Sequence, residues 1–200
     1  MSSQLLERGK SLFKSNQFSE AATAFQQVVE IDPSNTEAII GLAFALHATS
    51  QSAEALQVFE KGIKLSFNQP ELHFGHGLAL METGDPYRAI NEFKRTLELN
   101  PNHPLATKML QKALQIHTRE LMAAGNFNWA EQAIQNQLEL DPHCSDALAQ
   151  LTEFKHKMAE YEEAKRHFRI LTESKPDHPA IPDLAKLLGL IKHRERGWLY

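Results

Sequence analysis

The stretch PELHFGHGLALMETGDPYRAINEFKRTLELNPNH, residues 70–103, contains the pattern on which the fold depends. Its apolar residues recur every three or four positions, which is the spacing of an amphipathic α-helix. A turn with Gly84 interrupts the pattern, and Pro101 with its polar neighbours ends it. Glycine tolerates the left-handed conformation that ends a helix, and proline stops the second helix. The stretch therefore predicts two helices joined by a short turn.

The same pattern recurs with a period of 34 residues. Phe25, Phe59 and Phe93 keep this spacing. Two rows of small residues keep it as well: Ala21, Ala55 and Ala89, and Gly9, Ala43 and Gly77. From Pro101 to Pro142 the step is 41, seven more than the period. We therefore expect five helical pairs, at residues 2–35, 36–69, 70–103, 111–144 and 145–178, with an insertion at 104–110.

This period and pattern resemble the tetratricopeptide repeat, a helix-turn-helix unit of 34 residues. The matching residues of the third unit are Gly77, Leu80, Gly84, Ala89, Phe93 and Pro101. The resemblance covers about nine tenths of the chain and implies an all-α solenoid, with about five repeats stacked into a right-handed superhelix as a single domain over residues 1–200.

Two segments fall outside the repeats. The seven inserted residues equal about two helical turns, so we expect one long helix within residues 104–125. Residues from about 179 to 196 predict an amphipathic helix that caps the stack. Its expected apolar side consists of Leu184, Leu187, Leu188 and Ile191.

Composition argues against several classes of protein. The chain has 200 residues, 42% hydrophobic content and a formal net charge of −4, so nucleic acid is not the expected partner. Cys144 is the single cysteine, which suits a reducing compartment, and we expect a cytoplasmic protein. No segment of the sequence has the length and apolar character of a membrane helix, so membrane association is not expected.

No catalytic or cofactor motif is present in the sequence, and we expect neither an enzyme nor a bound cofactor. Cys144 follows His143 but lacks a third group to orient the pair. His73 and His76 could share one side of a helix as metal ligands, although a third ligand is missing there. In the repeat register they match packing positions, so two partly buried imidazoles are expected instead. Gly75 either gives the helix local flexibility or allows a close approach between helices, and the sequence leaves both explanations open.

The resemblance implies that the first helix of each repeat lines a concave face that accepts a peptide or helix. The lining positions so assigned are Leu6, Lys10, Phe13, Ile40, Phe44, His47, Phe74, Leu78 and Met81. Most of these are apolar, and an exposed apolar stripe marks an interaction surface. Burial of some of them by neighbouring helices is the alternative. Glu37 and Glu71, at places where family members that bind a peptide carboxylate carry cations, disfavour such a clamp.

We therefore expect a non-enzymatic scaffold or adaptor that binds a largely apolar segment of a partner protein. Two alternatives stay open: an auxiliary subunit that presents substrate protein to a separate enzyme, and a homo-oligomeric structural scaffold. The segment from Lys186 to Arg196 is locally basic, which is typical of a helix C-terminus; contact with an anionic membrane or nucleic acid is the alternative. The aromatic Trp198 and Tyr200 could dock in a groove of the same or another copy.

Overall fold

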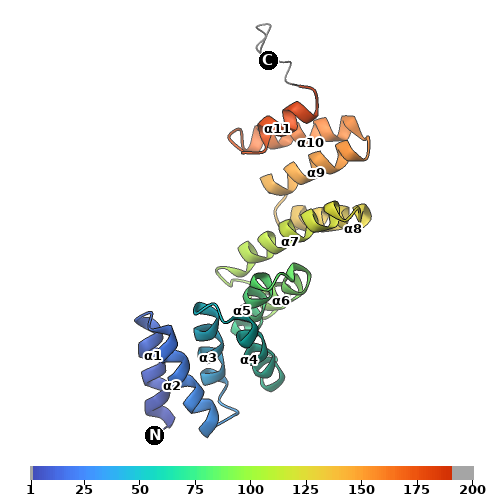
Figure 1. Ribbon diagram of the computed structural model, residues 1–200. Helices are drawn as coiled ribbons and strands as arrows, with labels where there is room; N and C mark the ends of the chain where they lie inside the picture. Colours follow the sequence, from blue (N-terminus) through green and yellow to red (C-terminus); the bar gives the residue numbers. More distant parts are fainter. Residues whose placement is uncertain (1, 191–200) are drawn as a thin grey trace. The chain divides into compact units, whose positions relative to one another are not determined.

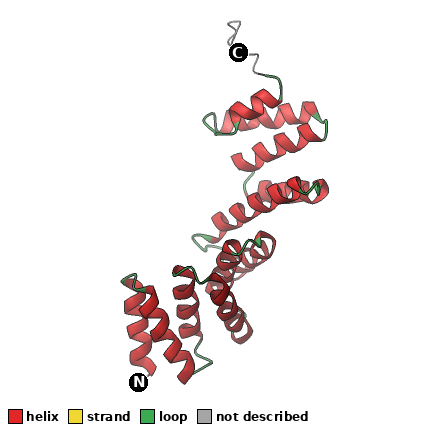
Figure 2. Cartoon of the chain, viewed as in Figure 1, coloured by secondary structure: helices red, strands yellow, loops and turns green. Residues whose placement is uncertain are grey.

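The computed structural model describes residues 2–190, and every regular element in this range is a helix (Figures 1 and 2). The eleven helices of this range are α1 (Ser2–Lys14), α2 (Phe18–Ile31), α3 (Thr36–Ala48), α4 (Ser52–Leu65), α5 (Pro70–Glu82), α6 (Pro86–Leu99), α7 (Ala106–Ala123), α8 (Phe127–Leu140), α9 (Ser145–Lys157), α10 (Tyr161–Ser174) and α11 (Ile181–Leu187). The predicted all-α class is confirmed.

Sequential helices pack against one another, as a helix-turn-helix repeat requires. Helix α1 packs on α2, α3 on α4, α5 on α6, and α9 on α10. Helix α7 has 18 residues, so part of the insertion continues into a single long helix, as expected. The structure divides into two compact units, Met1–Ala113 and Leu114–Tyr200, with the boundary inside α7.

A residue in the left-handed conformation follows the first helix of each repeat. Asn16, Ser50 and Ala159 have φ of 59°, 61° and 59°, and Gly84 and Gly125 have φ of 81° and 74°. The next residue then donates its N–H back across the helix end, as in the 2.9 Å bond from the Gln17 nitrogen to the Leu12 oxygen. This bond satisfies a carbonyl that the helix leaves free. The turns predicted at residues 16, 50, 84 and 125 are confirmed.

The core of the first unit includes phenylalanine rings that lie over glycines. Phe25, 2% exposed, lies between α1 and α3, and a Cβ at Gly9 or Gly41 would come within 2.8 or 2.6 Å of its ring. Phe59 lies over Gly75 in the same way, and Phe93 lies over Gly77. This contact decides between the two explanations of Gly75, because the glycine permits the close approach of the Phe59 ring.

The second unit has a smaller apolar core and a buried polar network. Ala130, Ile134 and Ala147 are fully buried. The side-chain amide of Gln137 donates to Thr118 and to Gln150, at 3.1 and 3.2 Å. These bonds satisfy polar groups that have no access to water and so join α7, α8 and α9.

One lysine links three helices of the second unit. The Nζ atom of Lys155 on α9 lies 3.1 Å from a carboxylate oxygen of Glu131 on α8. It also lies 2.8 Å from Glu160 and 3.4 Å from Glu163, at the start of α10. Hydrogen bonding to Glu160, followed by Glu131 and Glu163, outweighs burial and raises the pKa of Lys155 above its ordinary value. The amine is therefore a fixed positive charge in this packing.

The expected capping helix is shorter than predicted. Helix α11 ends at Leu187 because Gly189 takes φ of 68°, and the Leu190 nitrogen donates to the Ala185 oxygen at 2.8 Å. This arrangement ends a helix. Leu184 is buried, whereas Leu187 is 41% exposed. The predicted residues from Ile191 to Arg196, and the aromatic tail after them, lie outside the described residues.

Candidate peptide-binding site

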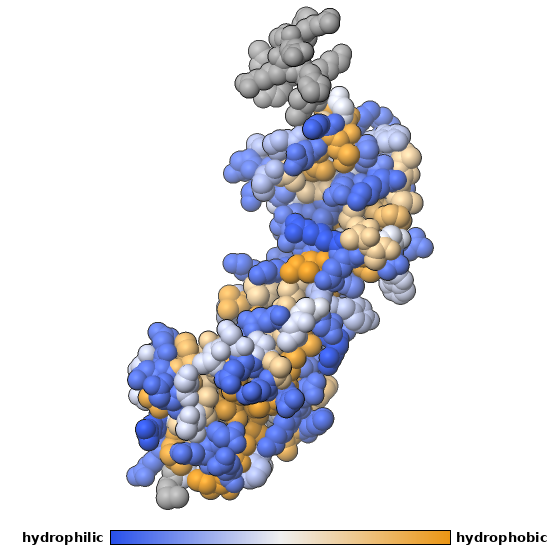
Figure 3. Space-filling view, in the orientation of Figure 1, coloured by the Kyte–Doolittle hydropathy of each residue, from blue (hydrophilic) through white to orange (hydrophobic). Residues whose placement is uncertain are grey.

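A depression of about 440 Å³ lies between α1 and α3 in the first unit. Its lining consists of Lys10, Phe13, Lys14, Phe25, Glu37, Ile40, Gly41 and Phe44. Hydrophobic side chains of this unit reach the surface in patches between hydrophilic ones (Figure 3). We call this depression the α1–α3 pocket. Its volume suits one or two large side chains, so it can receive part of a peptide but not a folded domain.

The floor of the α1–α3 pocket is apolar and firmly supported. The Phe25 ring lies against Gly41, where any side chain would meet it. Phe44 on α3 packs edge-to-face on the buried Phe59, with the ring centroids 5.2 Å apart. Phe13 on α1 contacts Phe18 in the same geometry at 5.1 Å. Because their rings are held from behind, these side chains present a preformed apolar surface.

An ion pair closes one side of the rim. The Nζ atom of Lys10 on α1 lies 2.6 Å from a carboxylate oxygen of Glu37 on α3 and 2.9 Å from Glu7. Hydrogen bonds to Glu37 and Glu7 raise the pKa of Lys10 above its ordinary value. Lys14 lines the rim one turn further along α1. The pocket therefore has an apolar floor and a rim of mixed charge.

Four of the predicted lining residues meet in the α1–α3 pocket: Lys10, Phe13, Ile40 and Phe44. Leu6 is half-buried and packs against the apolar core around Phe25. The Nδ1 atom of His47 lies 3.3 Å from a carboxylate oxygen of Glu82, which also accepts a hydrogen bond from the Ser52 hydroxyl. Leu78 and Met81 are half-buried on α5 and do not line the α1–α3 pocket.

Phe74 differs from the expectation that it faces an open groove. Its side chain is 7% exposed, because it packs against Phe93 of α6 at 5.9 Å and against His103 at 4.4 Å between ring centroids. Burial by neighbouring elements, the alternative left open by the sequence, applies to this residue. A charge at position 74 would disturb the core, so Phe74 is unsuitable for testing a binding surface.

Phe25, Glu37 and Gly41 belong to the α1–α3 pocket although the lining prediction did not include them. Phe25 comes from the second helix of its repeat, whereas the prediction considered only first helices. A signal for it is present in the sequence, since Gly41 follows Phe25 by 16 residues and Gly75 follows Phe59 by the same step. The repeated spacing marks rings that lie over glycines.

His73 and His76 are buried, with exposed fractions of 2% and 3%, as the packing interpretation predicted. Within residues 2–190, no three side chains of histidine, cysteine, aspartate or glutamate are grouped so that they could hold a metal ion. None of the helices in that range is long and apolar enough to cross a membrane.

Comparison with known proteins agrees with this architecture. A model of the tetratricopeptide repeat matches residues 12–78 and 121–188, and a second model of the same repeat matches residues 70–103. The chain therefore belongs to the tetratricopeptide repeat family. No curated protein sequence matches it.

Several solved structures share the fold. The crystal structure of YrrB, described as a tetratricopeptide repeat protein with an unusual peptide-binding site, is 21% identical over 91% of this chain and 90% of that one, with a TM-score of 0.67. A crystal structure of MamA is 18% identical over 88% and 92%, with a TM-score of 0.65. The first such domain of Spaghetti (RPAP3), bound to an HSP90 peptide, is 25% identical over 57% and 90%, with a TM-score of 0.55.

Proposed function

We propose that this chain is a non-catalytic protein-interaction module whose first unit holds a peptide or helix of a partner protein by a large apolar side chain. The α1–α3 pocket is the observation that carries the proposal. It combines an apolar floor, support from the buried Phe59 ring and a rim of mixed charge, and these features suit an anchor residue of a partner.

Related structures support a peptide as the occupant. YrrB is described as having a peptide-binding site, the RPAP3 domain is bound to an HSP90 peptide, and the secretion chaperone SycD is in complex with a YopD peptide. The pocket of the present chain differs in character from a site for a free carboxylate, because Lys10 on its rim is already paired with Glu37 and Glu7. We therefore expect apolar contact to provide most of the affinity.

Selection from a random peptide library displayed on phage tests the proposal without a known partner. Peptides retained by the wild-type chain are measured by calorimetry against Ile40→Glu and against Ile31→Glu. Ile40 lines the α1–α3 pocket, whereas Ile31 is 51% exposed at the end of α2 and lies outside it. The two variants carry the same substitution in the same unit, so they form a matched pair.

Ile40→Glu should weaken binding roughly tenfold or more, because the peptide side chain would have to desolvate the new carboxylate. Ile31→Glu should bind like the wild type, and both variants should retain the helical circular dichroism spectrum. Equal binding by all three proteins would show that the peptides dock elsewhere. Enrichment of peptides without a large apolar residue would also contradict the proposal.

A further inference from the structure

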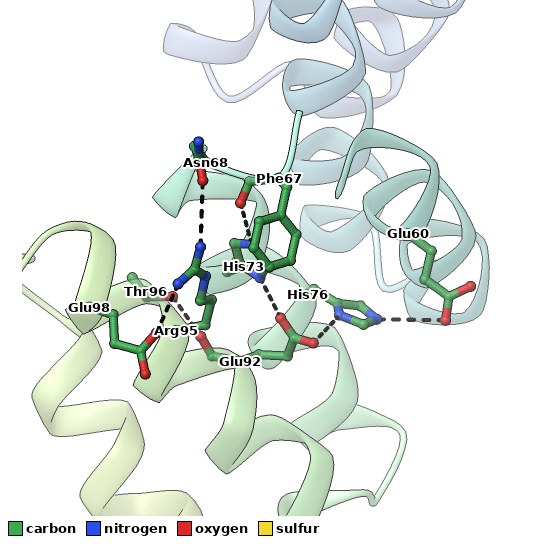
Figure 4. A network of polar contacts seen from close by, with 9 residues as sticks. All are labelled: Glu60, Phe67, Asn68, His73, His76, Glu92, Arg95, Thr96 and Glu98. Atoms are coloured by element: carbon green, nitrogen blue, oxygen red, sulfur yellow. Dashed lines mark hydrogen bonds and ion pairs between the residues drawn. The ribbon is translucent and has the colours of Figure 1, made fainter. Parts of the chain in front are cut away.

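A cluster of ionisable side chains lies between α4, α5 and α6, and it shares no residue with the α1–α3 pocket (Figure 4). We call it the His73 cluster; it consists of His73 and His76 on α5, Glu92 on α6 and Glu60 on α4. Figure 4 shows the rings of His73 and His76 directed at the two oxygens of Glu92. Both imidazoles are almost completely buried. Their protonation is therefore decided by their partners in the protein rather than by water.

Both ring nitrogens of His73 face hydrogen-bond acceptors. Its Nδ1 atom lies 2.7 Å from Oε2 of Glu92, and its Nε2 atom lies 2.9 Å from the backbone oxygen of Phe67. A carbonyl oxygen can only accept, and so can an ionised carboxylate. A neutral imidazole has one N–H and can serve one of these acceptors. The other nitrogen would then direct a lone pair at an oxygen, which is repulsive at this distance.

A second proton removes this conflict, and it can reside on His73 or on Glu92. Burial raises the pKa of Glu92, but the imidazoles of His76 and His73 at its two oxygens outweigh burial and lower the pKa overall. The ionised carboxylate is therefore the favoured form, and the proton belongs on the ring. The resulting bonds are charge-assisted, which suits their short lengths.

We propose that His73 is a structural proton-binding site: its ring carries N–H groups on both nitrogens and ties the α4–α5 turn to α6 through Phe67 and Glu92. Release of one proton leaves one of the two acceptors without a donor. The chain before α5 or the contact with α6 then loses its hydrogen bond. The third repeat is accordingly stabilised by protonation.

The second repeat lacks the proline found at the end of the first and third repeats, and the hydrogen bonds of a protonated His73 can fix the turn in its place. Where the first and third repeats have Pro33 and Pro101, the second has Phe67. The Phe67 ring packs edge-to-face on His73 at 5.4 Å between centroids, and the guanidinium of Arg95 lies 4.4 Å from the centroid of the Phe67 ring. His73 holds the carbonyl of the same residue. The protonated ring thus fixes a turn that proline fixes elsewhere.

The charged groups around the cluster favour an additional positive charge. The charged groups in and around the cluster are Glu60 of α4, Asp85 at the N-cap of α6, and Arg88, Glu92, Arg95 and Glu98 of α6. Each arginine is occupied, since Arg88 approaches Glu60 at 3.5 Å and Arg95 approaches Glu98 at 2.9 Å. On α5 itself, Nδ1 of His76 lies 3.2 Å from Glu92. Helix α3 presents His47 to Glu82 at the opposite end of α5. Carboxylates outnumber the fixed cations in this set, which favours a positive ring.

Proton uptake on folding has a defined consequence for stability. An unfolded histidine releases its proton near pH 6.5. A site that keeps the proton only when folded adds stability at low pH and loses it as the pH rises past the value at which the folded chain releases it. For one linked proton, the folding equilibrium constant falls by up to about tenfold per pH unit in that range. Stability should therefore decrease between about pH 6.5 and the pH of release from the folded chain.

Nitrogen-15 NMR of the histidine rings in the full chain tests the proposal directly. At pH 7.0, His73 should show two protonated nitrogens, and these signals should be absent from His73→Gln, which assigns them. The exposed His143 in the same sample provides the reference for an ordinary ring. A single protonated nitrogen on His73, or a protonated Glu92 carboxyl in the carbon-13 spectrum, would overturn the proposal.

Urea denaturation as a function of pH provides a second test with a matched control. The amide of Glu92→Gln can donate to Nδ1 of His73, so a neutral ring then satisfies both contacts. This variant should lose the decrease in stability above pH 6.5. Glu82→Gln makes the same change beside His47 and should keep it. An unchanged pH profile in Glu92→Gln refutes the proposal, and if that variant does not fold, the NMR result on the wild type decides.

Discussion

Replacing Gly75 by alanine probes the closest contact in the first unit. A Cβ atom at this position would lie 2.2 Å from Cζ of Phe59 and 2.9 Å from Cζ of Phe44. Ordinary van der Waals contact begins at 3.4 Å, so the Phe59 ring must move by more than about 1 Å. Phe59 is fully buried and packs on Phe44, which leaves little space for such a movement.

The expected change is the difference between two opposing effects. Overpacking a buried site costs about 1–3 kcal/mol, and the short distance places Gly75→Ala near the upper end. Alanine in a helix interior is favoured over glycine by about 1 kcal/mol. The net destabilisation should therefore be about 2 kcal/mol. Urea denaturation followed by circular dichroism measures it, provided that the slope of the transition is unchanged.

A double-mutant cycle with Phe59→Leu separates the two effects. Leucine is shorter than phenylalanine, so in this background the added methyl group should no longer meet a ring at position 59, and the Phe44 ring, 2.9 Å away, can move into the space that Phe59 leaves. Gly75→Ala should then be neutral or stabilising by up to about 1 kcal/mol, which gives a coupling energy of about 2–3 kcal/mol. An equal loss of stability in both backgrounds would show that the Phe59 ring is not what requires glycine at position 75.

Three further predictions can be tested by urea denaturation. Lys155→Met removes the ammonium group that joins three carboxylates and should destabilise the second unit by roughly 1–3 kcal/mol. A loss below about 0.3 kcal/mol would show that the lysine does not hold these helices together. Ala159→Gly should stabilise by roughly 1 kcal/mol and Gly84→Ala should destabilise by a similar amount, because both positions have positive φ; equal signs would refute this explanation. Below about pH 4.3 the wild type should lose stability as Glu92, whose pKa is lowered, becomes protonated, and Glu92→Gln should lack this decrease.

Features that repeat along the chain were predictable from the sequence. The 34-residue period predicted the helical pairs, and the residues at 16, 50, 84 and 125 were recognised as positions for a left-handed conformation. Burial of His73 and His76 followed from the repeat register, because their counterparts in other repeats are packing residues. In each case the comparison of several repeats gave information that one segment alone does not contain.

Features that depend on contacts between different helices were not predictable in the same way. The resemblance to the tetratricopeptide repeat assigned Phe74 to an open groove, but Phe93 and His103 from other elements cover it. The expected cap extended beyond Leu187 because the apolar pattern continues, whereas Gly189 ends the helix. The acceptor for His73 at Phe67 is a backbone oxygen, which the amino-acid sequence does not identify.

The contact between Phe25 and Gly41 also offers a route to engineered specificity. The ring forms the pocket floor only because position 41 has no side chain. Exchanging the two together, for example Phe25→Leu with Gly41→Ala, would move bulk from one helix to the other and reshape the floor with little change in the total volume of the core. If the pocket holds a peptide as proposed, such a pair should change which anchor side chain it accepts, so that a peptide with a matching side chain could address this one interaction.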